Sequence, residues 1–472
     1  MSVTGTESVP VGSDVLAQMD EARITAFHWK VMFISGMGFF TDAYDLFIIG
    51  VVMEMLKSEW TISALAQGLV TSTALVASAF GAILFGRVAD MLGRKRIYGY
   101  EVLVLAAGAI ASAFSPNIWW LIVFRIILGI GIGGDYPVSA TIMAEYASRK
   151  TRGMLVTLVF TMQAAGLIIG PILAAVLIGA GLHSSLAWRL LLAFGAVPAL
   201  AVFQMRRRLA ETPRYLLAAG HHEAFHSTAA HVLTSLQNAQ PAAPAPEART
   251  RAKASFRDGF AMLITNHRWT TRLVGASLAW FCMDFAYYGN TVSSPLVLDA
   301  ITPAKSLLWH ILLQLSVFAV AALPGYLLAA AMMDRMGRKA IQILGFAMMA
   351  VSFAAIALVP DIEKLIVPFV VVYGISYFFT EFGPNATTFV YPAEIFPVEA
   401  RTTGHGIAAA MGKLGGFVGV FLFPILLHWH GLLAAELAAA AISILGLLVT
   451  LWMLPETKSR SLEDLSLESA AA

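Results

Sequence analysis

The chain has 472 residues, of which 58% are hydrophobic and only 13% are charged, and its mean hydropathy is +0.75. Soluble domains contain about 25% charged residues, so a shortage of charge along the whole chain indicates that most of it lies in lipid. The formal net charge of +2 argues against nucleic acid as a partner. The single cysteine, Cys282, excludes a disulfide or a cysteine-based metal site within one chain.

The first part of the chain, residues 1–26, is polar and lacks the basic start and short apolar core of a signal peptide, so we expect a tail there. A spanning helix needs roughly 20 mainly apolar residues. Such runs predict one set of six helices within residues 27–207, at 27–52, 63–90, 96–114, 118–146, 152–180 and 186–207. They predict a second set within residues 269–454, at 269–297, 307–334, 338–358, 363–391, 399–428 and 431–454. The predicted fold is an all-α membrane protein with twelve transmembrane helices.

Residues 208–268, between the two sets, are polar and predict a linker. Within them, residues 237–255 are rich in alanine, proline and charge, which is typical of a flexible segment. Residues 455–472 predict a second tail. Four histidines in this linker are candidate metal ligands, His221, His222, His226 and His231. We expect no metal site from them because the segment reads as mobile.

Lysine and arginine gather in alternate short loops, after the second, fourth, sixth and eighth predicted helices. They are Arg94, Lys95, Arg96, Arg149, Lys150, Arg152, Arg206, Arg207, Arg208, Arg335, Arg338 and Lys339. The other loops are nearly free of basic residues. Because cytoplasmic loops carry the excess of positive charge, we expect both termini and the linker in the cytoplasm. The membrane is then the plasma membrane, or the inner membrane of a bacterium.

The two sets of helices repeat each other at a nearly constant offset. The segment 86–96, GRVADMLGRKR, returns at 332–340 as MMDRMGRKA. Ala144-Glu145 before a basic loop returns as Ala393-Glu394, and Glu211-Thr212 returns loosely as Glu456-Thr457. Three repeats at equivalent places predict two parallel halves of six helices.

The loop at 86–96 contains the pattern G-x-x-x-D-x-x-G-R-K/R, in Gly86, Asp90, Gly93 and Arg94. This pattern resembles the signature of the major facilitator superfamily, and the resemblance extends over nearly the whole chain. It implies two six-helix bundles related by a pseudo-two-fold axis. Acids and bases of such loops can form ion pairs that break when the halves rock apart, or they can serve orientation alone. The candidate gate residues are Asp90, Arg94, Glu145, Arg152, Asp334, Arg338, Glu394 and Arg401.

Charged side chains within the predicted helices are candidates for function, because each is costly in lipid. They are Asp42, Asp45, Glu101, Arg125, Asp135, Asp284, Glu381 and Lys413. Counting about 1.5 Å per residue from the basic loops, Asp135, Gln163, Asn385 and Lys413 come to one level near the middle of the bilayer. A substrate site is expected at that level between the halves.

The predicted helix at 269–297 adds Trp280, Asp284 and Tyr288, whose spacing places them on one face. With Tyr136, Lys413 and the amides, they supply one cation, several hydrogen-bond donors and carboxyl groups, which suits a small oxyanion. The alternatives are that Lys413 only pairs with a buried aspartate, and that the aromatic residues only pack.

Three long segments resemble the phosphate:proton symporters of the superfamily: 36–47, GMGFFTDAYDLF; 129–153, GIGIGGDYPVSATIMAEYASRKTRG; and 382–406, FGPNATTFVYPAEIFPVEARTTGHG. The resemblance implies a phosphate site formed by Tyr136, Gln163, Trp280, Asp284, Tyr288, Asn385 and Lys413. It also implies proton-linked carboxylates at Asp42 or Asp45 or both, Asp135 and Asp284. The chain is shorter than the fungal members, mostly in the central loop and the tails.

The coupling has a physical reason of its own. Burial disfavours a charged carboxylate, and a bound anion disfavours it further. Protonated Asp284 can donate a hydrogen bond to phosphate, whereas deprotonated Asp284 repels it. Proton and anion therefore bind and leave together, as in symport.

Several alternatives stay open. The substrate can be another small solute, such as an organic acid or a sugar, or the chain can be a transporter-like receptor that senses phosphate. An enzyme is less favoured, because no nucleophile–base pair or metal cluster lies in the predicted helices, and no phosphate-binding loop for ATP is present. We expect no cofactor and a functional monomer. Glu101 can form an ion pair or a proton relay, Arg125 can tune a carboxylate or only pair with one, and the role of Glu381 is open.

Overall fold

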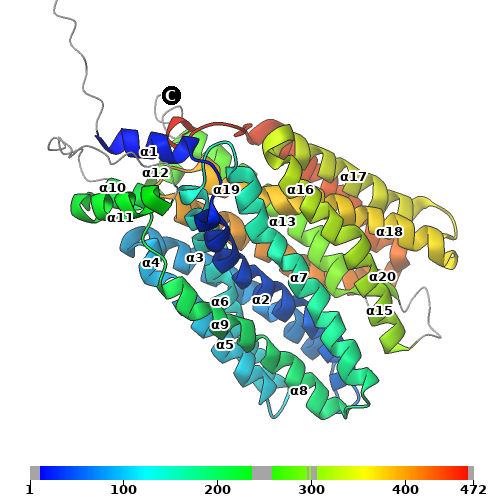
Figure 1. Cartoon of the computed structure of the whole chain (residues 1–472). Helices are drawn as coiled ribbons and strands as arrows, with labels where there is room; N and C mark the ends of the chain where they lie inside the picture. Colours follow the sequence, from blue (N-terminus) through cyan, green and yellow to red (C-terminus); the bar gives the residue numbers. More distant parts are fainter. Residues whose placement is uncertain (1–10, 236–257, 295–296, 299–305, 466–472) are drawn as a thin grey trace, which may run out of the picture.

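A computed structural model of the chain describes residues 11–235, 258–294, 297–298 and 306–465. The described residues form helices and connecting turns, with no strand among them. The helices run side by side in one elongated bundle (Figure 1). The predicted flexible segment at 237–255 lies outside the described residues, which end at 235 and resume at 258.

The first half of the chain contains the helices α1 to α9. Their bounds are α1 Val11–Glu21, α2 Ala26–Leu56, α3 Ala64–Leu92, α4 Arg94–Ile97, α5 Tyr100–Ala113, α6 Ile118–Tyr146, α7 Arg152–Gly179, α8 Ser184–Phe194 and α9 Ala196–Arg207. The pairs α4–α5 and α8–α9 each form one long, apolar stretch. Six crossings of the membrane therefore begin with α2 and end with α9.

Three short helices follow, α10 Pro213–Ala218, α11 His222–Ser235 and α12 Gly259–Thr265. The second half then contains α13 His267–Val292, α15 Leu307–Val317, η1 Phe318–Ala322, α16 Leu323–Met336, α17 Arg338–Leu358, η2 Ile362–Lys364, α18 Ile366–Thr380, η3 Glu381–Asn385, α19 Ala386–Ile395 and α20 Arg401–Met453. The stretches α15–α16 and α18–α19 are continuous through η1 and η3. This half repeats the order of crossings of the first.

Nine described stretches are long and apolar enough to cross a membrane. The longest of them, α20, bends at Gly431, where φ is +70°, a conformation that glycine adopts without strain. It supplies two crossings, where the sequence predicted separate helices at 399–428 and 431–454. The helices α2 and α13 are outside the nine, but they have 31 and 26 residues, and at 1.5 Å per residue even the shorter reaches about 39 Å. Together these helices make the twelve crossings of the predicted fold.

The repeat seen in the sequence corresponds to a repeated turn. Gly93 and Gly337 both have positive φ angles, +102° and +97°, and each opens the next helix. Glu211 accepts a hydrogen bond from the Lys95 amide at 3.0 Å, and Glu456 accepts one from the Arg338 amide at 3.0 Å. A carboxylate at a helix N-terminus is stabilising because it pairs with free amides. The glutamates of the third repeat therefore cap equivalent helices.

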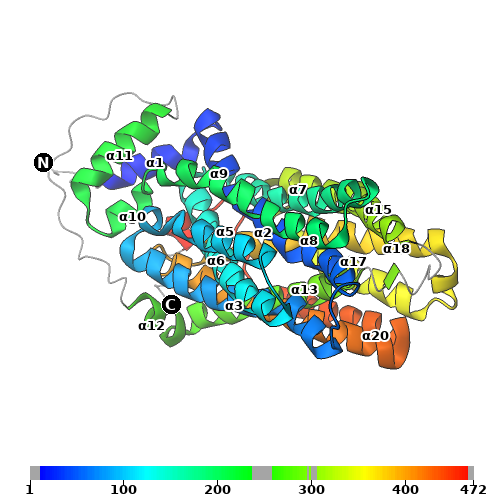
Figure 2. The ribbon, with the colours of Figure 1, turned by 90° about the horizontal axis from the view of Figure 1, so that it is seen from below.

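The tail and linker contain more structure than the sequence predicted. The predicted tail at 1–26 includes α1, and the predicted linker at 208–268 includes α10, α11 and α12. His222, His226 and His231 lie on α11 and not in a mobile segment. The short helices gather at one end of the molecule (Figures 1 and 2). We call this end, which also holds the basic loops after α3 and α16, the charged end.

Candidate functional site

A buried lysine lies where the two halves meet. Lys413 of α20 donates hydrogen bonds to the hydroxyl groups of Tyr136 and Tyr288, at 2.9 and 2.7 Å. Its Nζ lies 3.5 Å from a carboxylate oxygen of Asp284. Tyr136 comes from α6 in the first half, and the others from the second. All four side chains are at most 2% exposed. The ammonium group has three N–H donors. Two of them bind the tyrosine hydroxyl groups, and the positive charge is balanced by the nearby carboxylate of Asp284.

Two glycines on α20 allow this helix to pack closely against α13. A Cβ atom at Gly412 would overlap the ring of Trp280, and one at Gly416 would lie 2.9 Å from the Tyr288 ring. Close approach of two helix backbones through glycine is a common way of packing helices in membranes. The predicted face of Trp280, Asp284 and Tyr288 is thereby held against Lys413. Phe47 of α2 stacks on Tyr288 with ring centroids 5.3 Å apart and an interplanar angle of 8°.

The two amides of the predicted site bind other partners. Gln163 donates to the hydroxyl of Tyr287 at 3.3 Å. Asn385 donates to the hydroxyl of Tyr326 at 2.9 Å and to the carboxylate of Glu381. The seven residues predicted for the substrate are therefore arranged in two groups. We call Lys413 with Tyr136, Trp280, Asp284 and Tyr288 the lysine cluster, and Gln163 and Asn385 with Tyr287 and Tyr326 the amide–tyrosine cluster.

The amide–tyrosine cluster is placed by a break in the helix that links α18 to α19. In η3, Gly383 departs from helical geometry, with φ −100° and ψ −114°, and Pro384 follows it. Proline removes a backbone donor and a helical hydrogen bond, and single wide turns of this kind are frequent at functional sites. Glu381 and Asn385 lie at the two ends of the break, both buried. Their side chains, four residues apart, meet across it.

Tyr287 and Tyr326 were missed by the sequence reasoning. Tyr287 is the neighbour of a predicted residue but lies off the face of Trp280, Asp284 and Tyr288. Tyr326 lies in an apolar run, where its hydroxyl group is the only sign of a polar role. Buried tyrosines usually need a partner for that hydroxyl, and this is the signal that was available.

The proton-linked candidates of the first half differ in their surroundings. Asp135 forms a salt bridge with Arg206 at 2.9 Å and accepts a hydrogen bond from Ser139. Arg206 also pairs with Glu101 at 2.8 Å. One arginine therefore joins both carboxylates. Arg206 was interpreted only as part of a basic loop, because it stands in a run of three arginines at the end of α9.

Asp42 and Asp45 are buried in α2, and no hydrogen bond to their carboxylate oxygens is found among the described residues. Arg125 donates to the backbone oxygens of Val70 and Asp45, at 3.0 and 3.4 Å. The arginine therefore lies beside Asp45 without a hydrogen bond to its carboxylate. A buried carboxylate with no donor is costly as an anion and much less so when protonated. Both aspartates thus have the surroundings of proton-binding groups.

The charged end is closed by a network that crosses between the halves. Arg94 lies 3.2 Å from Asp90 and 3.3 Å from Glu145, and Arg401 of the second half lies 2.9 Å from Glu145. In the second half, Arg338 pairs with Asp334 at 2.9 Å and with Glu394 at 2.6 Å. The network brings together seven of the eight predicted gate residues.

Two aspartates of this network cap helices of the opposite half. Asp90 accepts a hydrogen bond from the amide of Thr403 at 2.7 Å, close to the start of α20. Asp334 accepts hydrogen bonds from the amides of Gly153 and Met154, at 3.1 and 2.7 Å, close to the start of α7. Helix N-termini attract anionic groups through free amides and the helix dipole. The two halves are therefore joined by reciprocal caps.

The eighth gate residue has a partner in the first helix. Arg152 pairs with Asp20 of α1 at 3.0 Å, and Asp20 also pairs with Arg214 of α10 at 2.8 Å. Arg214 continues to Glu463 near the C-terminal end. The tail and linker helices are thus connected to the predicted gate residues.

Comparisons with known proteins agree with this architecture. The family model for sugar (and other) transporters matches residues 21–468. Inorganic phosphate transporter 1-11 of Oryza sativa subsp. japonica is 34% identical over 504 residues, which cover 96% of this chain and 90% of that protein. Inorganic phosphate transporter 1-4 of Arabidopsis thaliana is 34% identical over 518 residues, which cover 96% of each protein.

The solved structures similar to this one include the proton:xylose symporter XylE. XylE bound to 6-bromo-6-deoxy-D-glucose gives a TM-score of 0.77 at 20% identity, covering 93% of this chain and 98% of that one. The inward-open conformation of XylE from E. coli gives 0.67 at 20% identity, covering 93% and 99%. This chain therefore has the major facilitator fold and belongs to the family of sugar (and other) transporters, which are multi-pass membrane proteins.

Proposed function

We propose that this protein transports inorganic phosphate together with protons, by alternating access of one site to the two sides of the membrane. The observation that carries the proposal is the buried cluster of Lys413, Tyr136, Tyr288 and Asp284, built from both halves. A buried ammonium beside two hydroxyl donors suits a tetrahedral oxyanion. The relatives named as inorganic phosphate transporters, similar over nearly their whole length, support the same substrate.

The cluster also supplies a reason for coupling. Asp284 is 3.5 Å from the ammonium group that would hold the anion. As an anion it competes with phosphate for Lys413, and as a neutral acid it donates a hydrogen bond instead. Phosphate then binds best when Asp284 is protonated, and loss of that proton favours release. The proton of Asp284 is then released, together with phosphate, on the side of the membrane to which the site has opened.

Asp42, Asp45 and Asp135 are the other proposed proton carriers. The first two have the unpaired surroundings of such groups. The carboxylate of Asp135 forms a salt bridge with Arg206, and protonation of the carboxylate would weaken it. Together with Asp284 they couple proton entry to the packing of both halves.

The charged end is the proposed cytoplasmic gate. Its basic loops belong on the cytoplasmic side by the positive-inside rule, and α1 and the described C-terminal end are joined to the same end through Asp20 and Glu463. Opening requires that the caps formed by Asp90 and Asp334 separate from the opposite half. We propose that the protein acts in the plasma membrane, as a monomer, since each chain carries a whole site between its halves.

A neutral sugar is the less favoured substrate. It would leave the Lys413 ammonium buried beside a substrate without charge, which costs several kcal/mol unless Asp284 stays ionised. The likeness to XylE concerns the fold and does not favour a sugar.

The test is uptake of radiolabelled phosphate by the purified protein in liposomes, with and without an inwardly directed proton gradient. We expect accumulation only with the gradient, and competition by arsenate. Lys413→Ala should abolish uptake, whereas Lys364→Ala, which removes an exposed lysine paired with Asp361, should not. Equal uptake without the gradient, or competition by a sugar instead of arsenate, would contradict the proposal.

A further inference from the structure

The second half contains a buried carboxyl group that the proposed cycle does not use. Glu436 lies on α20 beyond the bend at Gly431, and its side chain is fully buried. Within the described part of the chain, neither of its carboxylate oxygens has a hydrogen-bond donor. The side-chain amide of Asn290 faces it, and the Oδ1 atom of that amide also has no partner there. A carboxyl group in such a place is stable when it carries a proton.

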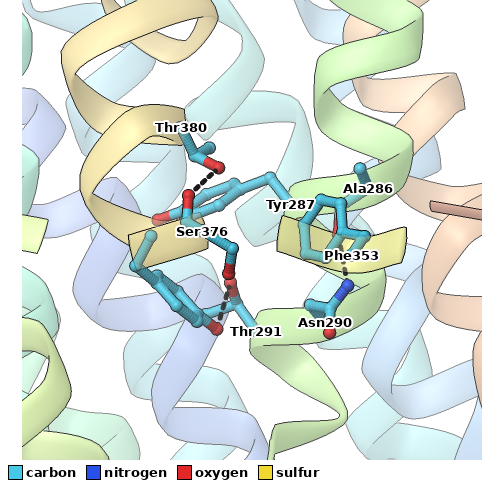
Figure 3. Close-up of a pocket in the computed structure, with 8 residues that line it drawn as sticks. Ala286, Tyr287, Asn290, Thr291, Phe353, Ser376 and Thr380 are labelled. Atoms are coloured by element: carbon cyan, nitrogen blue, oxygen red, sulfur yellow. Dashed lines mark hydrogen bonds between the residues drawn. The ribbon is translucent and has the colours of Figure 1, made fainter. Parts of the chain in front are cut away.

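A small polar cavity begins at Asn290 (Figure 3). It has a volume of about 10 Å³ for the centre of a water-sized sphere, which is room for about one water molecule, and its walls come from α13, α17 and α18. The residues that line it with hydroxyl groups are Tyr287, Thr291, Ser376, Tyr377 and Thr380. A hydroxyl group can accept one proton and donate another. The volume is sufficient for a water molecule, which needs two to four polar partners.

The far side of this cavity leads to a second buried carboxyl group. Glu381 follows Thr380 directly, and its Oε1 has no hydrogen-bond donor among the described residues. Its other oxygen accepts from Asn385, a residue predicted for the substrate site. Tyr377 is near enough to interact electrostatically with both Glu381 and Glu436.

Hydrogen bonds join the hydroxyl groups along this route. Tyr377 donates to Thr291 at 3.0 Å, and the hydroxyl groups of Tyr377 and Tyr373 are 3.3 Å apart. Tyr373 in turn donates to the backbone oxygen of Asn290 at 3.3 Å. These hydrogen-bonded hydroxyl groups include Tyr373, near Glu436, and Tyr377, near both acids. Among the described residues no hydrogen bond is found from them to either glutamate, so the proposed route needs a water molecule at each end.

Few charged groups surround Glu381 and Glu436. Glu381 is faced by Tyr287, Tyr326 and Asp284. Glu436 is faced by Asn290 and lies near Tyr373. In the described part of the chain no salt bridge joins either acid to a lysine or arginine, in contrast to Asp135 and Asp284. No fixed cation therefore holds either group in its charged form.

We propose that Glu436 and Glu381 are the two ends of a proton path inside the second half, which delivers a proton beside Asn385. The inference rests on the proposed proton-coupled transport. A proton leaves the carboxyl group of Glu436, each hydroxyl group or water on the route accepts one proton and donates one, and Glu381 receives a proton. The carboxylate of Glu436 is then reprotonated from water. Only a proton moves, and no electron is transferred.

The entry point fits the direction of uptake. Glu436 is five residues beyond Gly431, so it lies about 8 Å along the helix from that bend. The bend is exposed and lies between the two crossings of α20, 30 residues from Arg401 at the gate. Protons from the outer side thus have a short distance to cover, and they arrive through the second half and not through the Asp135–Arg206 pair of the first.

The test compares Glu436→Gln with the parent protein in three measurements. They are gradient-driven phosphate uptake, phosphate–phosphate exchange without a gradient, and the number of protons bound with phosphate, from calorimetry in two buffers. We expect Glu436→Gln to keep exchange, to bind fewer protons with phosphate, and to lose most of the gradient-driven uptake. Glu436→Asp should restore part of it, and Tyr377→Phe should reduce it. Ser443→Ala, a buried change two turns further along α20, is the matched control and should change nothing.

The outcomes separate the two claims. Absence of gradient-driven phosphate uptake in the parent protein would overturn the proposed function. Uptake in the parent that Glu436→Gln leaves unchanged, with the same number of protons bound, would overturn only the proton path. Uptake that requires sodium ions and loses this requirement in Glu436→Gln would overturn it in favour of a cation site. If Glu436→Gln does not fold, Tyr377→Phe decides, and unchanged proton binding in that variant refutes the path.

Discussion

The charged end and the centre of the molecule use charge in different ways. At the charged end, each predicted gate residue has a partner, and the partners repeat from one half to the other: Asp90 caps α20, and Asp334 caps α7. In the centre the halves differ, because one lysine faces the substrate level and no equivalent lysine lies in the first half. Several central acids also have carboxylate oxygens without a hydrogen-bond donor among the residues that the structure describes. Repeated, satisfied pairs suit a gate that opens and closes, whereas unpaired acids suit groups that take up and release protons.

The largest expected effect is on the central acid nearest the lysine. Asp284→Asn keeps the size of the side chain but removes its titration and its negative charge. We expect gradient-driven accumulation of phosphate to disappear while exchange of phosphate persists, since binding no longer depends on a proton. Uptake and exchange in liposomes measure the two separately. Accumulation equal to that of the parent would show that the centre does not couple through this acid.

The next largest effect is expected at a gate cap. Asp90→Ala leaves Arg94 and the start of α20 without their shared carboxylate, and loss of one partner of a buried pair costs about 3–5 kcal/mol. Hydrogen exchange of the amides at 401–406 should become faster by up to about a thousandfold, because 1.4 kcal/mol corresponds to a factor of ten. Asp361→Ala, which breaks an exposed pair with Lys364, should have almost no effect. Unchanged exchange in Asp90→Ala would mean that the cap does not hold the gate.

A smaller effect is expected for the hydroxyl groups around the lysine. Tyr136→Phe and Tyr288→Phe each remove one acceptor of Lys413. An unsatisfied buried donor costs about 1–3 kcal/mol, so phosphate affinity should change by up to about a hundredfold. Binding calorimetry with phosphate measures this. Tyr100→Phe, on an exposed ring, is the control, and equal affinities in all variants would exclude these hydroxyl groups from the site.

The smallest effect is expected at the repeated turns. Glu211→Gln and Glu456→Gln keep the shape of the cap but remove its charge, which is worth about 0.3–1 kcal/mol at a helix N-terminus. The melting temperature should fall by a few degrees in both variants, and by similar amounts because the turns repeat. Glu54→Gln, in the last turn of α2, breaks only a partly exposed pair with Lys57 and should not lower the melting temperature. A large loss in one variant only would show that the halves are less alike here than their geometry indicates.

The helices were predictable because lipid requires long apolar runs, and the face of Trp280, Asp284 and Tyr288 follows from helical spacing alone. Depth along the helices placed Lys413 near mid-bilayer, but the meeting of this face with Lys413 was expected from the resemblance to the phosphate:proton symporters. The partner of Asp135 was not predictable in this way. Arg206 stands among two other arginines at a helix end, and only the tertiary structure shows that its side chain is buried between α5 and α6.

The amide–tyrosine cluster and the burial of Glu436 were not predicted from the sequence, for a different reason. The position of Asn385 depends on the break at Gly383, and a break changes which residues share a face. Glu436 lies in an alanine-rich run where one acid gives no sign of which side it faces. Spacing rules assume a regular helix, and they lose their value where the backbone departs from it.

The reciprocal caps have a consequence for the moment when the gate opens. As Asp90 and Asp334 withdraw, the first amides of α20 and α7 lose their negative partners together. Two helix ends with partial positive charge then line the widening exit from opposite sides. In the proposed cycle, a phosphate ion leaving through this end would pass between them, so the amides that cap the closed gate would attract the anion once the gate is open.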